Sequence, residues 1–161
     1  MTVISTQPPQ LSDSEVQKII QNIYGIEASV LTLDSERDQN FHLKGDDGNE
    51  YVLKISNPKE DLEIIKLQSA SLKHIHAFDQ SLNVPVPIES IKGKIVNHVD
   101  GNIVRVQSFI KGIFIKDVEN PSPELLNEFG KFLGKLDIAF KEFDYPELKR
   151  DWVWDIRNIG F

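Results

Sequence analysis

Alternating apolar and polar positions predict three short strands in the first third of the chain. Residues 28–34, 40–45 and 50–56 read ASVLTLD, NFHLKG and EYVLKIS, with an apolar side chain at about every second position. The sequence GDDGN, between the second and third segments, is typical of a tight hairpin turn. We therefore expect these last two segments to pair as antiparallel strands.

A helical pattern precedes the strands. In LSDSEVQKIIQNIYGI an apolar residue returns every three or four positions, which predicts a helix with one apolar face. Ser12 and Glu15 have the spacing of a capping box, in which each side chain bonds to the backbone of the other residue. Gly25 stands where such a helix would end.

Two longer helices are predicted further along the chain. The helix after the third strand has Asn57 as its expected N-cap and Pro58 at its first position. The last helix has Ser122 as its cap and runs from Pro123 to Phe143 with a long apolar stripe. We expect that stripe to leave an exposed patch, and the chain to dimerise, swap this helix or aggregate.

Two further strands are predicted between these helices. The prolines of VPVPIES favour an extended segment, and KGKIVNHVDGNIVRVQSFIKG contains two strand patterns around the hairpin dipeptide Asp100-Gly101. The order is therefore helix, three strands, helix, two strands, helix. Tight turns between neighbouring strands indicate an antiparallel sheet of about five strands with the helices segregated around it, so the predicted fold class is α+β.

Composition narrows the class of protein and its partners. A chain of 161 residues corresponds to about one domain, and it contains no cysteine, which excludes disulfides and Cys-based metal sites. The net charge of −7 disfavours nucleic acid and anionic membranes as partners. No apolar run approaches the ~18 residues of a membrane span, and the N-terminus lacks the apolar core of a signal peptide. The expected location is the cytoplasm.

Two polar residues interrupt otherwise apolar patterns. Lys54 lies within the third strand, and Gln68 falls in the apolar stripe of the following helix, with Glu63 roughly opposite and facing water. A buried amide requires a hydrogen-bond partner, so we expect Gln68 to contact the ammonium of Lys54. In the alternative interpretation Lys54 lies on the solvent face of a half-exposed strand, where strand lysines usually lie.

YVLKI followed by a helix, VPVP, a hairpin and VQSFIKG resembles the N-terminal lobe of the protein-kinase-like fold, and most closely the aminoglycoside phosphotransferase superfamily. ERDQNFHLKGDDGNEYVLKISNP and SPELLNEFGKFLGKLDIAFKEFDYPELKRDWVWDIRN are most similar to hydroxylysine kinase-like domains, including those fused to a class III aminotransferase. The resemblance begins at about Tyr24. It implies an N-terminal lobe with a leading helix (1–107), a hinge (108–116) and the start of a truncated C-terminal lobe (117–161).

The resemblance also implies a nucleotide site. Lys54 matches the strand lysine that holds the phosphates of ATP, and Gln68 stands where the family usually has a glutamate that orients this lysine. A neutral amide can orient an ammonium but cannot neutralise it, so the pairing should be weaker. Asn40 matches an asparagine common in small-molecule kinases. The carbonyl of Ser108 and the amide of Ile110 match the hinge groups that face adenine.

Other motifs carry less information. The loop DSERDQN (34–40) occupies the place of the kinase phosphate-covering loop but contains no glycine, and a polar strand connection explains it equally well. His98 and Asp100 form an H-x-D, yet Arg105 stands where a kinase catalytic loop requires asparagine. We therefore assign Asp100 to a hairpin turn.

Two pairs of residues suggest sites that we do not assign. His74 and His76 are two positions apart and do not share a helix face, so we expect surface histidines and no metal site. Gly130 and Gly134 form a G-x-x-x-G in the last predicted helix. We expect them to let a neighbouring backbone approach closely.

The function implied by the resemblance is transfer of phosphate from ATP, with Mg²⁺, to a hydroxyl of a small amino compound, hydroxylysine- or aminoglycoside-like. In this superfamily the catalytic and magnesium-binding aspartates follow the first C-terminal-lobe helices, and the sequence stops at Phe161 before either. We assign no catalytic or metal-binding residue and expect an ATP-binding portion that binds ATP weakly or not at all and is inactive alone. A non-catalytic nucleotide-binding or regulatory module, and an interaction domain without nucleotide, stay open as alternatives.

Overall fold

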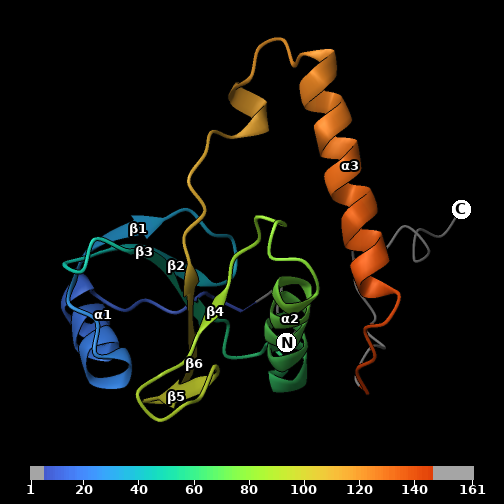
Figure 1. Cartoon of the computed structure of the whole chain (residues 1–161). Helices are drawn as coiled ribbons and strands as arrows, with labels where there is room; N and C mark the ends of the chain where they lie inside the picture. Colours follow the sequence, from blue (N-terminus) through green and yellow to red (C-terminus); the bar gives the residue numbers. More distant parts are fainter. Residues whose placement is uncertain (1–5, 147–161) are drawn as a thin grey trace, which may run out of the picture.

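The structure is a computed structural model that describes residues 6–146, and it consists of one antiparallel sheet with helices beside it (Figure 1). The predicted irregular tail beyond residue 146, and with it the end of the predicted C-terminal-lobe segment, lies outside the described residues. In chain order the elements are α1 (Asp13–Ile19) continued by a π-helical turn (Ile20–Tyr24), β1 (Ala28–Leu33), β2 (Gln39–Gly45), β3 (Glu50–Ser56), α2 (Leu62–Phe78), β4 (Pro87–Ile88), β5 (Asn97–Val99), β6 (Asn102–Ser108), a 3-10 turn (Ile115–Asp117) and α3 (Pro123–Phe140).

The sheet confirms the predicted α+β fold. Its strands follow the order β1-β2-β3-β6-β4, with β5 also paired to β6, and every pair is antiparallel. The additional strand is β4, a two-residue segment within VPVPIES that pairs with β6. A strand this short that begins with proline suits a sheet edge, because proline has no N–H to donate to a neighbouring strand.

The first helix begins and ends as predicted. The Ser12 side chain accepts from the Glu15 backbone N–H, and the Glu15 carboxylate accepts from the Ser12 N–H at 2.8 Å. Gly25 ends the helical segment with a left-handed backbone, at φ 67°. Its lack of a Cβ makes this conformation inexpensive.

The second helix begins later than predicted, because Asp61 and not Asn57 is its N-cap. Asn57 is fully buried, and its side chain donates to the carbonyls of Thr6 and Arg37 and accepts from the Lys59 N–H at 3.0 Å. This last bond closes a turn in which an asparagine side chain accepts from the backbone N–H two residues further along the chain. The same side-chain chemistry forms caps and such turns, so the sequence did not distinguish them.

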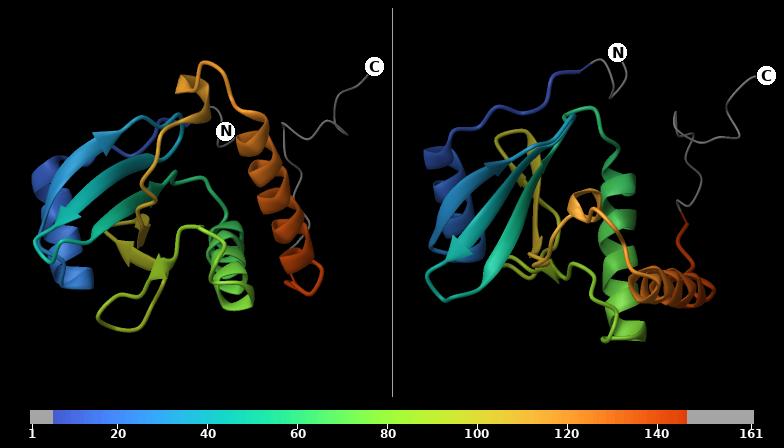
Figure 2. Two further views of the ribbon diagram at one scale, coloured as in Figure 1. Left: turned by 45° about the horizontal axis from the view of Figure 1, so that its top comes forward. Right: turned by 90° about the horizontal axis from the view of Figure 1, so that it is seen from above.

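The hydrophobic core lies between α1 and one face of the sheet (Figure 2). Inward positions on the three central strands alternate with positions on the other face, which carries mostly polar side chains. The fully or nearly fully buried members of this core are Val16, Ile20, Phe41, Leu43, Leu53, Ile55, Val104 and Val106.

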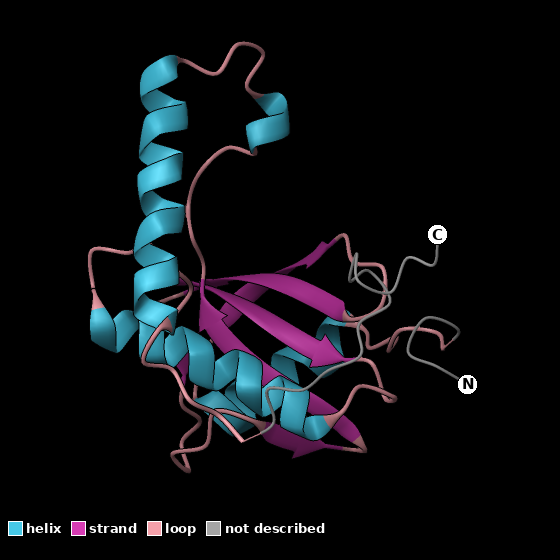
Figure 3. Cartoon of the chain, turned by 90° about the vertical axis from the view of Figure 1, so that its right-hand side faces the viewer, coloured by secondary structure: helices cyan, strands magenta, loops and turns pink. Residues whose placement is uncertain are grey.

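α3 follows β6 through a long connection and projects away from the sheet (Figures 1 and 3). Its C-terminal half packs against α2 through Phe132, Leu136 and Ala139. His74 of α2 is not the surface histidine that we predicted, because its ring Nε2 lies 2.7 Å from the carbonyl oxygen of Ala139 and the residue is partly buried. This hydrogen bond helps to fix α3 on α2.

The N-terminal half of α3 has the exposed apolar patch that the sequence predicted. Leu126 and Phe129 are 55% and 56% exposed. Gly130 and Gly134 do not support the predicted close approach, because a Cβ added at either would meet no atom within 4 Å in the described part of the chain. Gly130 lies in the half of the helix that stands clear of the other described elements, and Gly134 lies in the half that packs on α2 but faces away from that contact.

The β5–β6 connection is the hairpin turn predicted from its dipeptide. Asp100 and Gly101 both have a positive φ, 48° and 81°, and lie between two paired strands. Asp100 is therefore a turn residue and not part of a catalytic loop. Among the helices of residues 6–146, none has the length and apolar character needed to cross a membrane.

Candidate functional site

Three polar side chains form a row on the face of the sheet that α1 does not cover. Asn40 of β2 pairs with Lys54 of β3, and Lys54 pairs with Arg105 of β6. Directly paired residues of antiparallel strands project to the same face, so these three side chains are neighbours. Arg105 was missed as a site residue by the sequence analysis, which used it only to reject a catalytic loop.

Gln68 reaches this row from α2, and its partner there is Arg105. Arg105 Nη2 donates to Gln68 Oε1 at 2.6 Å, and Nη1 donates to the Ile65 carbonyl at 3.2 Å. Within residues 6–146 no hydrogen bond joins Gln68 to Lys54. The Gln68 amide, which we expected to bond to Lys54, bonds to Arg105 instead. Arginine has the longer reach and several N–H groups in a planar fork, which lets it bond to a helix and occupy a sheet position at once.

Glu63, predicted to lie opposite this site, lies at the outer side of α2. Its carboxylate is 2.6 Å from Lys66 Nζ, and its side chain is 43% exposed. α2 therefore presents an amide, and not this carboxylate, to the cations of the sheet.

A cavity of ≈390 Å³ opens at the row. The 34–40 loop forms part of its wall, and Asp38 of this loop is held by the Asn57 N–H, which donates to Asp38 Oδ1 at 3.0 Å. The structure thus brings the predicted residues Asn40, Lys54 and Gln68 together around one cavity. The full lining is polar: Ser35, Glu36, Arg37, Asp38, Asn40, Lys54, Glu60, Gln68 and Arg105.

Both cations of the row are partly withdrawn from water. Burial lowers the pKa of Lys54, and the positive charge of Arg105 lowers it further, while Asp38 acts in the opposite direction. Burial also lowers the pKa of Arg105, against the attraction of Asp38 and Glu60. Asp38 is therefore the carboxylate that attracts both cations, and the α2 carboxylate of Glu63 lies on the outer side of that helix.

Two buried polar atoms in this row have no hydrogen-bond partner within the described residues. They are Asn40 Oδ1 and Arg105 Nε. Buried polar groups are satisfied in the great majority of cases, so these two unpaired atoms are an unusual feature of the row beside the cavity.

Ser108 and Ile110 lie at the end of β6 and just beyond it. The Ser108 N–H donates to the Val86 carbonyl at 2.9 Å, and its Oγ accepts from the Val86 N–H at 2.8 Å. These bonds fix the point where the chain leaves the sheet. The assignment of the Ser108 carbonyl and the Ile110 amide to adenine stays a prediction.

A contact that the sequence did not reveal holds the connection after β6 to the sheet. The ring of Phe109 stacks on His42 of β2 with centroids 4.0 Å apart. His42 Nε2 lies 2.7 Å from a Glu50 carboxylate oxygen, and the other oxygen lies 2.6 Å from Lys111 Nζ. The hydrogen bond from Lys111 is the main cause that lowers the pKa of Glu50, so this carboxylate joins β2 and β3 to the segment that leaves the sheet.

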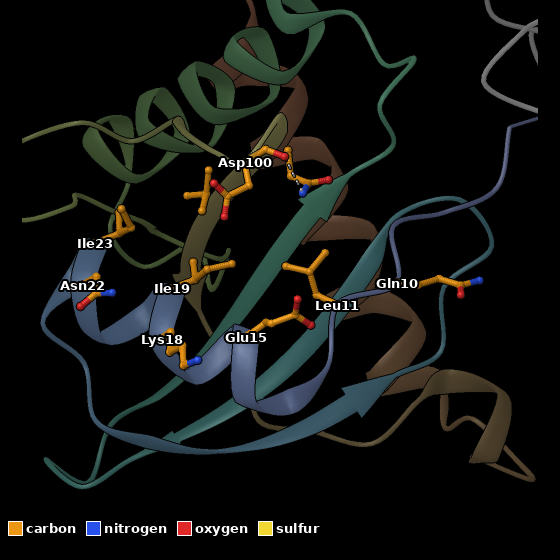
Figure 4. Close-up of a pocket in the computed structure, with 10 residues that line it drawn as sticks. Gln10, Leu11, Glu15, Lys18, Ile19, Asn22, Ile23 and Asp100 are labelled. Carbon is orange, nitrogen blue, oxygen red and sulfur yellow. Dashed lines mark hydrogen bonds between the residues drawn. The ribbon is translucent and has the colours of Figure 1, made fainter.

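A second cavity, of ≈410 Å³, lies between α1 and the β5–β6 turn (Figure 4). Its charged lining residues are Glu15, Lys18 and Asp100. Glu15 already serves the capping box, and Asp100 the turn. This cavity lies apart from the polar row, and we assign no chemistry to it. Among the described residues, no group of three or more His, Asp or Glu is placed to hold a metal ion.

The antiparallel sheet with α2 beside it, and the connection to α3, have the fold of the N-terminal lobe of a protein-kinase-like protein. The chain belongs to the phosphotransferase enzyme family (APH), whose model matches residues 29–157. The family resemblance seen in the sequence is thereby confirmed.

Two curated relatives match nearly the whole of this chain. The hydroxylysine kinase of Danio rerio is 28% identical over 94% of this chain and 46% of its own length. The hydroxylysine kinase of Bos taurus is 26% identical over 94% of this chain and 45% of its own length. The chain therefore spans about half the length of the curated relatives it matches.

Solved structures share the fold. Amicoumacin kinase hAmiN, in complex with AMP-PNP, Ca2+ and Ami, gives a TM-score of 0.73 at 17% identity, over 85% of this chain and 42% of that one. The microcompartment-associated aminopropanol kinase gives 0.64 at 15% identity, over 89% and 45%. At these identities the likeness concerns the fold alone.

Proposed function

We propose that this chain is the ATP-binding portion of a small-molecule kinase that phosphorylates a hydroxyl of an amino compound, hydroxylysine- or aminoglycoside-like. The observation that carries the proposal is the Lys54 row with its cavity, in a chain of the phosphotransferase family. The relatives named hydroxylysine kinase support an amino alcohol as the phosphate acceptor.

Several residues around the cavity suit a polyphosphate, and three carboxylates that also line it would oppose one. Lys54 supplies a compact positive charge at its wall, and Asn40 supplies an amide beside it. When bound, the nucleotide would supply the phosphate to be transferred, and Mg²⁺ would offset the negative charge of its phosphates. The adenine would lie at the backbone of Ser108 and Ile110. We place no magnesium ligand and no catalytic base among the described residues.

Gln68 favours a second candidate function. A helix amide that bonds to Arg105 leaves the site without the carboxylate that usually orients the kinase lysine. A nucleotide-binding module without catalysis would tolerate this arrangement.

The proposal is tested by titrating the 161-residue chain with ATP, followed by calorimetry or NMR. The sequence left weak binding and no binding as expected outcomes, and the formed cavity at Lys54 favours weak binding. We expect saturable binding with a dissociation constant on the order of 1 mM, because a cation partly open to water contributes modestly. Lys54→Met should weaken this binding at least about tenfold. The control is Lys44→Ala, an exposed lysine of β2, which should leave it unchanged. Absence of binding, or equal binding by the Lys54 variant, would refute the proposal.

A further inference from the structure

Arg105 is a buried cation directly beside another cation, which is an expensive arrangement for a purely structural residue. It is 7% exposed, and its register partner across β3 and β6 is Lys54. Like charges on directly opposed strand positions repel, and burial removes the water that would screen them. A negatively charged group that faces both cations would relieve this repulsion.

The fold holds the Arg105 guanidinium in one orientation. Its two terminal nitrogens each donate to α2, one to the Ile65 carbonyl and one to Gln68 Oε1. These bonds leave further N–H groups of the planar fork, and Nε is buried with no partner in the described structure. Asn40 Oδ1 is similarly unpaired at the other end of the row.

The negative charge that acts on both cations comes from a loop. Asp38 attracts Lys54 and Arg105, and Glu60 also attracts Arg105. Asp38 belongs to the loop between β1 and β2, and Glu60 belongs to the segment between β3 and α2. The two cations belong to the sheet. A phosphate group that entered the cavity would take the place of the Asp38 carboxylate as their counter-charge.

We infer that Arg105 is a second phosphate-binding cation, which forms with Lys54 a two-cation site for the polyphosphate of a nucleotide, and that Gln68 is its positioning residue. The inference rests on the proposed function and deepens it. Gln68 then has a role suited to an amide, because an amide oxygen fixes a guanidinium without cancelling its charge. A glutamate at the same position would compete with the phosphate for Arg105.

The wild-type chain allows a test that needs no substitution. Inorganic tripolyphosphate is titrated into the 15N-labelled protein while the side-chain Nε–H resonances of arginine are followed. We expect the Arg105 resonance to shift saturably, together with the amide resonances of Asn40. Saturable binding of tripolyphosphate that leaves the Arg105 resonance unmoved would overturn the inference.

Two conservative variants give opposite expected results. Arg105→Lys keeps the charge but loses the fork, and should weaken tripolyphosphate binding about threefold to tenfold. Asp38→Asn keeps an oxygen that can accept from the Asn57 N–H but removes the competing charge, and should strengthen binding by a similar factor. Lys44→Ala is the control and should change nothing. Thermal unfolding of each variant verifies that it is folded, and unchanged binding by both folded variants would overturn the inference.

Failure of the inference can be distinguished from failure of the proposed function. If ATP binds in a Lys54-dependent way and the Arg105 and Asp38 variants bind it as the wild type does, only the second cation is refuted. If the wild-type chain binds neither ATP nor tripolyphosphate, both are refuted. If tripolyphosphate binds with the predicted variant effects while adenosine does not bind, the anion site stands and the adenine assignment falls.

Discussion

Lys54 lies in the centre of β3 with an ammonium that is partly desolvated and next to another cation. Burial and Arg105 lower its pKa below the ordinary value of 10.5. The unfolded chain therefore binds this proton more tightly than the folded chain, so the residue destabilises the fold wherever it is charged in both states. That penalty shrinks as pH rises through the folded-state pKa toward the unfolded value.

Lys54→Met should consequently raise stability while it removes phosphate binding. The urea midpoint of the variant is expected to exceed that of the wild type at about pH 7, and the difference should narrow as pH approaches about 10, where the wild type loses its penalty. The difference between the two proteins is the readout, since other groups titrate in both. A variant that is less stable at neutral pH would show that Lys54 serves the fold.

The residue that the sequence did not assign to the site, Arg105, could have been found by the argument applied to Lys54. It stands between Val104 and Val106 in the apolar middle of its strand, as Lys54 stands between Leu53 and Ile55. Its position beside Lys54 could not be predicted, because the β3–β6 register joins residues about fifty positions apart. Helical spacing alone correctly predicted that Gln68 faces the sheet. The expected hydrogen bond between Gln68 and Lys54 is absent from the described residues, because the register places Arg105 where it bonds to Gln68 instead.

At the scale of elements, periodicity predicted β1, β2, β3, β5, β6 and the three α-helices, since each has one face on the core or beside it. Short features escaped it. β4 has only two residues and depends on a neighbour distant in sequence, and the segment before Asp61 forms a turn whose asparagine resembles a cap. In each case a tertiary contact decided between two locally acceptable conformations.

The connection that leaves β6 is predicted to depend on His42. His42→Ala removes the imidazole ring that stacks on Phe109 and contacts Glu50, and should cost about 1–2 kcal/mol in unfolding free energy. Amide exchange at residues 109–111 should rise more than exchange in the core strands. Lys111→Ala is the control, because its side chain is 74% exposed and should contribute less than about 1 kcal/mol. Equal protection of 109–111 in both variants would contradict the assigned role.

At the scale of the whole molecule, the exposed apolar surface of α3 predicts that copies of the chain associate. Leu126 and Phe129 expose apolar surface along a half-helix that no other described element covers. We expect sedimentation and light scattering to show dimers or larger species, and Phe129→Glu to shift the chain toward monomer. Lys131→Ala, on the same helix, should not. A wild-type chain that stays monomeric at high concentration would contradict this expectation.

The central claim is that the Lys54 cavity and the end of β6 bind one nucleotide. It is tested most directly by mapping the amide resonances of the 161-residue chain during titration with ATP. The account predicts saturable shifts at Lys54 and Asn40 and at Ser108 and Ile110, with one common dissociation constant. Shifts confined to the cavity between α1 and the β5–β6 turn, with the Lys54 row unmoved, would contradict it.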